Sequence, residues 1–338
     1  MAKKKKKSRL AKKIQRRVVK GVIIPLIILL FAYVFISAAD HFDLNIGVDV
    51  DLGGYGIFDL IGADGDEEET TSIPKAPIVT EGDEVAFHFI DVGQGDAILI
   101  TTAEGNILID TSEKSEREAL VNYLAEQNIT SLKYLILTHT DADHIGSADY
   151  VVENYDVDTV MMTDYTATTK TYERLLTAIE NKGTNVIIPE LRYVFTLGSL
   201  QMTIIAPTEK FDDPNEMSLV IKAVHGETSL MFTGDAEIES EEGILENWSA
   251  AELKVDILKV GHHGSDSSTT QAFLDALDPD AAVISCGEGN SYGHPHAEVV
   301  DRLTAKGVTI YRTDKDGTVV IISDGKEWNL VDNQKMGE

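Results

Sequence analysis

Short apolar runs recur along most of the chain beyond residue 84, separated by turn residues and polar stretches. The first three runs, at 85–92, 96–101 and 106–111, are rich in β-branched residues, which predicts strands that begin a sheet in antiparallel order. Further strand-like runs follow at 134–138, 158–163, 185–189, 202–207, 218–224, 229–235, 255–261, 281–287, 308–313 and 318–323. The pattern therefore predicts a domain built from many short strands.

Two stretches between these runs have the spacing of amphipathic helices. Residues 116–128 place Leu120, Tyr123 and Leu124 on one helical face. The same i, i+3, i+4, i+7 spacing is repeated by Tyr172, Leu175, Leu176 and Ile179. Strands that alternate with such helices predict an α/β domain, with two mixed sheets that carry helices on their outer faces.

The N-terminal segment has a different character. Residues 1–20 carry eight Lys and three Arg with no acidic residue, and residues 21–39 form an uncharged, mostly apolar run of nineteen. That run is about long enough to cross a bilayer as a helix, and the basic segment 1–20 favours a cytoplasmic N-terminus. We therefore expect a single-pass anchor in the cell membrane, with the remainder outside the cell. The alternative is a cleaved signal peptide, because Ser37 and Ala39 offer a small-residue cleavage site.

Composition separates the rest of the chain into a linker, a domain and a short tail. Residues 40–83 are rich in Asp, Gly, Glu and Thr without apolar periodicity, which predicts a flexible acidic linker before a domain at 84–332 and a tail at 333–338. Beyond residue 39 only 18 basic residues face all 57 acidic ones. No stable nucleic-acid complex is expected of such a surface. The single cysteine, Cys286, excludes an internal disulfide and a multi-cysteine zinc site.

Metal-capable side chains gather behind the predicted strands. Six of the nine histidines lie in three short motifs, and a fourth strand ends at Asp235. The motif histidines are His139 and His144, His262 and His263, and His294 and His296. Ligands in α/β folds collect beyond the carboxyl ends of strands, so the four motifs are expected to meet at one edge. Each motif alone has an ordinary explanation as a turn, cap or polar loop, but their convergence predicts a metal site.

These motifs carry a family resemblance. The stretch HTDADH at 139–144 resembles the HxHxDH signature of the metallo-β-lactamase fold, with Asp235 and the GHHGS stretch as later metal motifs. More narrowly, residues 89–100, 137–146, 258–269 and 292–300 resemble the metallo-hydrolase domain of the ComEC/Rec2 competence family. The resemblance implies a four-layer αββα sandwich, here preceded by one N-terminal transmembrane helix. Because only one apolar segment is present, we carry over hydrolysis and not DNA transport.

The resemblance also implies a ligand set for one or two divalent ions. Asp143, His144 and His262 would hold one ion, and Asp235 would bridge to a second ion served by His139 and Asp141. Two positions depart from the general fold: Asp141 replaces a second histidine, and a third histidine is absent, with Asn215 and Ser218 in that region. Because this ligand set is rich in oxygen atoms, it favours binding of Mn²⁺ without excluding Zn²⁺.

Catalytic roles follow from the same motifs. Asp143 or Asp141 would orient or deprotonate the attacking water, and His294 would bind a phosphoryl oxygen or protonate the leaving group, with His263 as a second candidate. Asp96 is expected to shape the floor of the site, and Asp110 to support a turn.

The function expected from these roles is that of an anchored, extracytoplasmic phosphodiesterase or nuclease. Its substrate would be short or single-stranded DNA, a nucleotide or a wall polymer. Two alternatives stay open: hydrolysis of a lactam, lactone or thioester on the same fold, and a non-catalytic anchored domain that binds a wall polymer or a partner.

Overall fold

The computed structural model describes residues 77–78 and 82–331. The basic segment 1–20, the predicted membrane span at 21–39, most of the predicted linker and the tail at 333–338 lie outside these residues. Within the described part, none of the helices has the length and apolar character needed to cross a bilayer.

The first sheet has eight strands in the order β15-β14-β1-β2-β3-β4-β5-β6. Strands β1, β2 and β3 pair in antiparallel fashion, which confirms the predicted antiparallel start, and β3 to β6 pair in parallel. The strands are β1 (Val85–Phe89), β2 (Ile98–Thr102), β3 (Gly105–Ile109), β4 (Ser131–Leu137), β5 (Asp156–Met162), β6 (Asn185–Ile187), β14 (Val319–Ser323) and β15 (Trp328–Leu330).

The second sheet has seven strands in the order β13-β12-β11-β10-β9-β8-β7. Within β7, β8, β9 and β10 each pair of neighbours is antiparallel, and within β10, β11, β12 and β13 each pair is parallel. Both sheets are therefore mixed, as predicted. The strands are β7 (Val194–Leu197), β8 (Leu200–Ala206), β9 (Val220–His225), β10 (Thr228–Phe232), β11 (Ile257–Lys259), β12 (Ala281–Ile284) and β13 (Thr309–Arg312).

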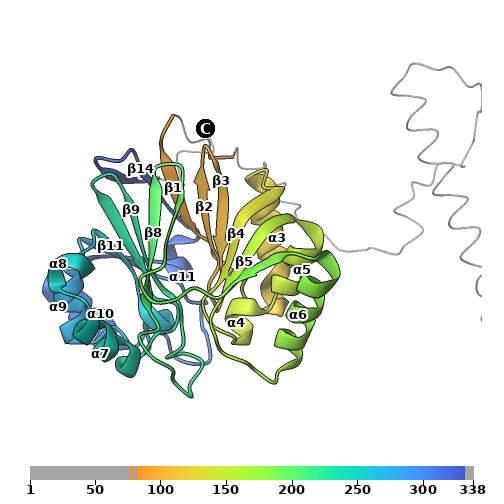
Figure 1. The fold of residues 1–338 in the computed structure, drawn as a ribbon. Coiled ribbons are helices and arrows are strands. Elements are labelled where there is room, and N and C mark those ends of the chain that lie inside the picture. The colour runs from red at the N-terminus through yellow and green to blue at the C-terminus, as the bar shows by residue number, and fades with distance from the viewer. Residues whose placement is uncertain (1–76, 79–81, 332–338) are drawn as a thin grey trace, which may run out of the picture. The chain divides into compact units, whose positions relative to one another are not determined.

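Helices cover the outer face of each sheet, which gives four layers (Figure 1). On the first sheet these are α3 (Arg117–Glu126), α5 (Ala148–Asn154) and α6 (Lys170–Lys182). On the second they are α7 (Ile238–Asn247), α8 (Ala250–Leu253), α9 (Gln271–Leu277) and α10 (Ala297–Lys306). Short helical turns are η3 (Lys114–Glu116), α4 (Ala142–Ile145), η4 (Gly261–Gly264) and α11 (Thr313–Asp316).

Three apolar cores hold the layers together. The central core lies between the sheets and includes Phe87, Phe89 and Phe232, while one core lies under each helical layer. Helix α6 illustrates how the sequence builds a layer: Thr169 accepts a hydrogen bond from the backbone N–H of Tyr172 and caps the start, and Gly183 ends the helix in a left-handed conformation.

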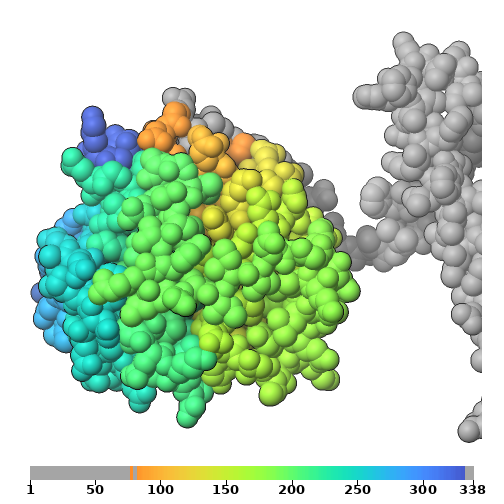
Figure 2. Space-filling model, viewed as in Figure 1, coloured from red at the N-terminus to blue at the C-terminus, as the bar shows by residue number. Residues whose placement is uncertain are grey.

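The two sheets bring both halves of the domain side by side, as the space-filling view also shows (Figure 2). Strand β3 pairs in parallel with β4 in the first sheet, and β10, β11 and β12 pair in parallel in the second sheet. The carboxyl ends of these strands therefore lie at one edge of each sheet. In the segments that follow these strands, Thr111 N donates to His144 O in the first sheet and His262 N donates to Gly234 O in the second, and the Nε2 atoms of His144 and His263 lie 3.3 Å apart across the two sheets. The strand ends therefore converge, as the motif positions predicted.

Candidate metal centre

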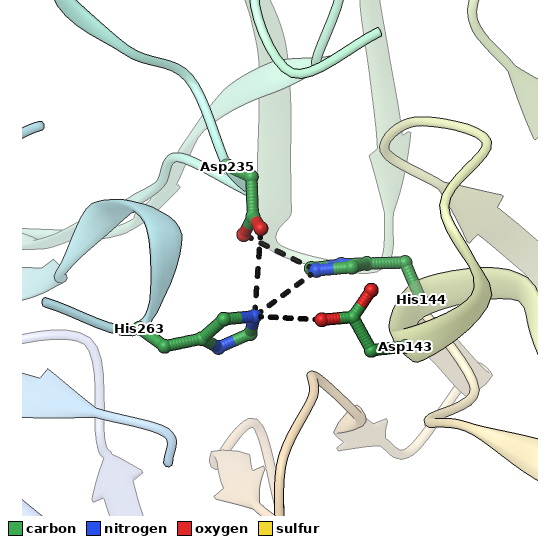
Figure 3. Close-up of side chains that lie close together, drawn as sticks. All are labelled: Asp143, His144, Asp235 and His263. Atoms are coloured by element: carbon green, nitrogen blue, oxygen red, sulfur yellow. Dashed lines mark hydrogen bonds and ion pairs between the residues drawn. The ribbon is translucent and has the colours of Figure 1, made fainter. Parts of the chain in front are cut away.

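Four side chains from three strand ends point toward one another (Figure 3). Asp143 and His144 lie in α4 behind β4, Asp235 follows β10, and His263 lies in η4 behind β11. One ligand atom from each of these residues lies within 4.8 Å of the others. We call this set of four residues the metal cluster.

His144 is oriented by a buried network behind it. Its Nδ1 lies 2.7 Å from Asp110 Oδ2, and Asp110 also accepts hydrogen bonds from the backbone N–H and hydroxyl of Thr138 at 2.8 and 2.7 Å. With Nδ1–H donating to the carboxylate, Nε2 faces the cluster. Asp110 therefore does more than support a turn: it fixes the ring of a cluster residue.

His263 is oriented in a similar way. Its Nδ1 donates to the carbonyl oxygen of Ser285 at 3.0 Å, and its Nε2 lies 3.4 Å from a carboxylate oxygen of both Asp143 and Asp235. The Nε2 atoms of His263 and His144 face each other at 3.3 Å. Two imidazole lone pairs so close require a proton or a cation between them.

His262 turns away from the point where these atoms meet. Both His262 and His263 have left-handed backbone conformations, with φ of 45° and 55°, so the adjacent side chains diverge. His262 Nδ1 lies 2.7 Å from Glu237 Oε1, and its Nε2 is 3.7 Å from Asp235 Oδ2. We predicted His262 as the ligand and His263 as an aid to catalysis, whereas the geometry places His263 in the cluster and His262 at its rim.

His139 and Asp141 lie outside the four-residue cluster. His139 is buried, and its ring centroid is 4.1 Å from that of His144, while its Nε2 has no hydrogen-bond partner. Asp141 is exposed and precedes the first turn of α4. A buried imidazole nitrogen that lacks a hydrogen-bond partner is suited to bind a metal ion. Their role at a second ion stays a prediction.

His294 is half-buried in the loop after β12 and lies beside both adjacent histidines. Its ring centroid is 5.5 Å from that of His262 and 6.3 Å from that of His263. Asn290 holds the loop, because its Oδ1 accepts from His294 N at 3.0 Å and its Nδ2 donates to His294 O at 2.6 Å. Burial and the neighbouring imidazoles lower the pKa of His294 to about 4.

Charges in the cluster stabilise one another. Burial alone would raise the pKa of Asp235, but His144 and His263 outweigh it and hold that pKa well below its ordinary value. Burial opposes protonation of His144 and His263, yet Asp235 and the other carboxylates raise the pKa of both imidazoles well above the ordinary value. A divalent cation would take the place of these protons, and the two imidazoles and two carboxylates are suitable donors for one.

A second row of buried charge lies behind the cluster. Asp96, Asp110 and His144 form a further group of candidate ligands, but Lys259 Nζ lies 2.9 Å from Asp96 Oδ2 and neutralises it. Sequence reasoning missed Lys259, Glu237 and Ser285. Lys259 occupies a strand position surrounded by apolar residues. This position could have indicated a buried ion pair, because a lysine is rarely buried without a partner.

Comparison with known proteins agrees with this geometry. Residues 90–288 match the family model of the metallo-beta-lactamase superfamily. The chain belongs to that superfamily. It is 34% identical over 253 residues to ComE operon protein 3 of Bacillus subtilis, which covers 68% of this chain and 32% of that protein. It is 29% identical over 247 residues to competence protein ComA of Neisseria gonorrhoeae, covering 72% of this chain and 33% of that protein.

The matches define what the relationship covers. The chain spans about a third of the length of these curated relatives. Among solved structures, the metallo-beta-lactamase fold protein YhfI from Bacillus subtilis aligns with a TM-score of 0.48 at 13% identity, covering 72% of this chain and 100% of that one. The family match and the curated relatives place the chain among the metal-dependent hydrolases of this superfamily, related to the ComEC/Rec2 competence proteins, and its His and Asp cluster is suited to divalent metal.

Proposed function

We propose that the protein is a metal-dependent phosphodiesterase, anchored in the cell membrane with its hydrolase domain outside the cytoplasm. The observation that carries the proposal is the cluster of Asp143, His144, Asp235 and His263 with the loop histidine His294 beside it. Its substrates would be short or single-stranded DNA, nucleotides or phosphodiesters of a wall polymer. The acidic composition favours short substrates, because a broad polyanion surface would need basic residues.

The cluster would hold one or two divalent ions, Zn²⁺ or Mn²⁺. Such an ion supplies Lewis-acid stabilisation of a phosphoryl oxygen and activates water at neutral pH. His144 and His263 would bind through Nε2, since their Nδ1 atoms face Asp110 and the Ser285 carbonyl oxygen. His139 and Asp141 would serve a second ion.

Asp143 and His294 are the two residues that we expect to act on the substrate. The Asp143 side chain is 29% exposed, so this member of the metal cluster can also orient or deprotonate the attacking water. His294 would bind a phosphoryl oxygen as a neutral imidazole, because its low pKa leaves it unprotonated at neutral pH. In this role its ring N–H donates to the oxygen that gains negative charge.

Elemental analysis and a substrate panel test the proposal on the full-length chain. We expect about one to two divalent ions per chain and hydrolysis of at least one phosphodiester with Mn²⁺ or Zn²⁺. His263→Ala should lower metal affinity and activity together while retaining measurable metal binding through the three remaining cluster residues, whereas the neighbouring His262→Ala should keep most of its metal. His294→Ala should keep metal and slow turnover by roughly 10²–10³, the usual cost of removing one hydrogen-bond donor to an oxygen that gains negative charge.

Three outcomes would contradict the assignment. Metal retained with wild-type affinity by Asp143→Ala, Asp235→Ala and His263→Ala alike would show that the cluster does not bind it. Hydrolysis of a lactam, lactone or thioester without any phosphodiester turnover would replace the substrate class. Metal loss in His294→Ala would make that residue a ligand.

A further inference from the structure

A buried ion pair lies beneath the metal cluster. Lys259 Nζ is 2.9 Å from Asp96 Oδ2, and the two side chains are 0% and 2% exposed. Lys259 is the last residue of β11 in the second sheet, and Asp96 lies in the turn between β1 and β2 in the first sheet. The pair therefore joins the two sheets directly behind the strand end that carries His263.

Such a pair is costly as a means of stability alone. Removing two charges from water costs several kcal/mol per ion, and apolar replacements of similar volume are often equally stable or more stable. Lys259 makes one further hydrogen bond, from Nζ to the Val260 carbonyl oxygen at 2.9 Å. Asp96 Oδ1 is buried and has no hydrogen-bond partner. The fold therefore retains a buried carboxylate oxygen without a hydrogen-bond partner, although its burial is unfavourable.

The unpartnered oxygen faces a cluster residue. Asp96 Oδ1 lies 3.5 Å from His263 Nδ1, beside the 3.0 Å hydrogen bond from that nitrogen to the Ser285 carbonyl oxygen. The N–H of His263 consequently has two acceptors on one side of the ring, one of them charged. His144 has its own carboxylate, Asp110, in the equivalent place. Both cluster histidines are therefore supported by a buried carboxylate behind Nδ1.

We propose that Asp96 and Lys259 are positioning residues for His263, with Lys259 holding the carboxylate of Asp96 against the Nδ1 side of the imidazole so that Nε2 is aimed at the metal. Carboxylates placed behind metal-binding histidines fix the ring and increase its basicity, and their loss typically weakens metal binding 10–100-fold. This inference rests on the metal binding of the proposed function and is independent of the substrate.

The experiment compares metal binding by the full-length wild type and the Asp96→Asn/Lys259→Met double variant. Removing both charges should leave the melting temperature close to that of the wild type, because no unpaired buried charge remains. The dissociation constant for Zn²⁺ should rise about 10–100-fold. The visible absorption spectrum of the Co²⁺ form, which reports ligand geometry, should shift. A merely structural pair would leave the spectrum and the affinity unchanged, and that result would overturn the proposal.

Two controls make the result specific. Lys254→Met/Asp278→Asn removes the same charges near the other end of β11, where Lys254 Nζ lies 3.0 Å from Asp278 Oδ2, and should leave metal binding unchanged. In a His263→Ala background, the Asp96→Asn/Lys259→Met changes should weaken metal binding no further, because their effect passes through His263. Equal weakening in both backgrounds would contradict a role through His263.

The remaining outcomes are also decisive. If this double variant does not fold, Asp96→Asn/Lys259→Gln, which also removes both charges but keeps two amides that can hydrogen-bond to each other, carries the same measurement, with the same expected rise in dissociation constant and the same overturning result. A wild-type chain that binds no divalent metal would contradict the proposed function itself, whereas normal metal binding by the variants would contradict the positioning role alone.

Discussion

His88 is a buried titratable residue outside the metal cluster. It lies in β1, and its Nδ1 and Nε2 are 2.8 and 3.4 Å from the hydroxyls of Tyr123 and Thr101. No charged group offsets its burial, which lowers its pKa to about 3. Below pH 6.5 the unfolded chain gains a proton that the folded chain does not bind, so the His88 contribution to stability is lost as pH falls from 6.5 toward 3.

His88→Gln should therefore change the pH dependence of stability. Gln is neutral throughout and can still hydrogen-bond to Tyr123. As pH falls from 6 to 4, the wild type should lose stability relative to the variant by about 1.4 kcal/mol per pH unit. Urea unfolding of both proteins at pH 4, 5, 6 and 7 measures this difference. Parallel curves would show that His88 does not titrate as its burial implies.

At the metal cluster, residue types were easier to predict from the sequence than individual roles. HTDADH placed Asp143 and His144 correctly beside Asp235, because a strand end and a short helix leave little freedom. Which of His262 and His263 faces the cluster depends on the left-handed backbone conformation of both residues, and the sequence does not indicate that conformation. Lys259 was hidden for another reason: its partner Asp96 lies 163 positions earlier, in the other sheet.

At the scale of elements, the turn after β1 packs against α4. Gly95 has a φ of +124°, and a Cβ at that position would overlap the carbonyl oxygen of Asp143. The next residue, Asp96, donates its backbone N–H to that same oxygen at 3.2 Å. The turn thus fixes the position of the helix that carries Asp143 and His144, and only glycine permits so close an approach.

Gly95→Ala should displace α4. A left-handed backbone costs about 1–2 kcal/mol for alanine, and overpacking adds about 1–3 kcal/mol, so we expect a loss of about 2–5 kcal/mol in unfolding free energy. Metal affinity should fall as well. The matched control is Gly289→Ala, which shares a positive φ of +64° but has no atom within 4 Å of the added Cβ. Equal losses in the two variants would show that contact with α4 is unimportant.

The elements themselves were predictable where local pattern and burial agree. The apolar runs that became β1 to β5 and β8 to β12 are β-branched and buried, and α6 shows helical spacing. The short edge strands β7 and β15 were not predicted, because they are only four and three residues long and two positions of each face solvent. Helices α7 and α9 were not predicted either. The sequence of α7 is acidic and α9 is short, so both gain their stability from packing on the second sheet.

At the scale of the whole molecule, the site exists only when both sheets have packed. The first half of the domain supplies Asp143 and His144, and the second half supplies Asp235 and His263. The central core that joins the sheets, together with the Lys259–Asp96 pair, holds these donors together. Metal binding is therefore coupled to folding, and metal removal should lower the melting temperature of the full-length chain.

The placement of this domain relative to the membrane is a prediction that rests on the N-terminal sequence. Eleven basic residues precede an apolar run of nineteen, so we expect the N-terminus to stay in the cytoplasm and the acidic domain to lie outside. A reporter that is active only outside the cytoplasm, fused after Glu338, should be active, and the protein should stay with membranes after a salt wash. Leu29→Arg with Leu30→Arg should abolish that association, because each charge at the centre of a span costs about 2.5–3.5 kcal/mol. A soluble mature form that begins at Asp40 would instead identify residues 1–39 as a cleaved signal peptide, and an inactive reporter would place the hydrolase inside the cell.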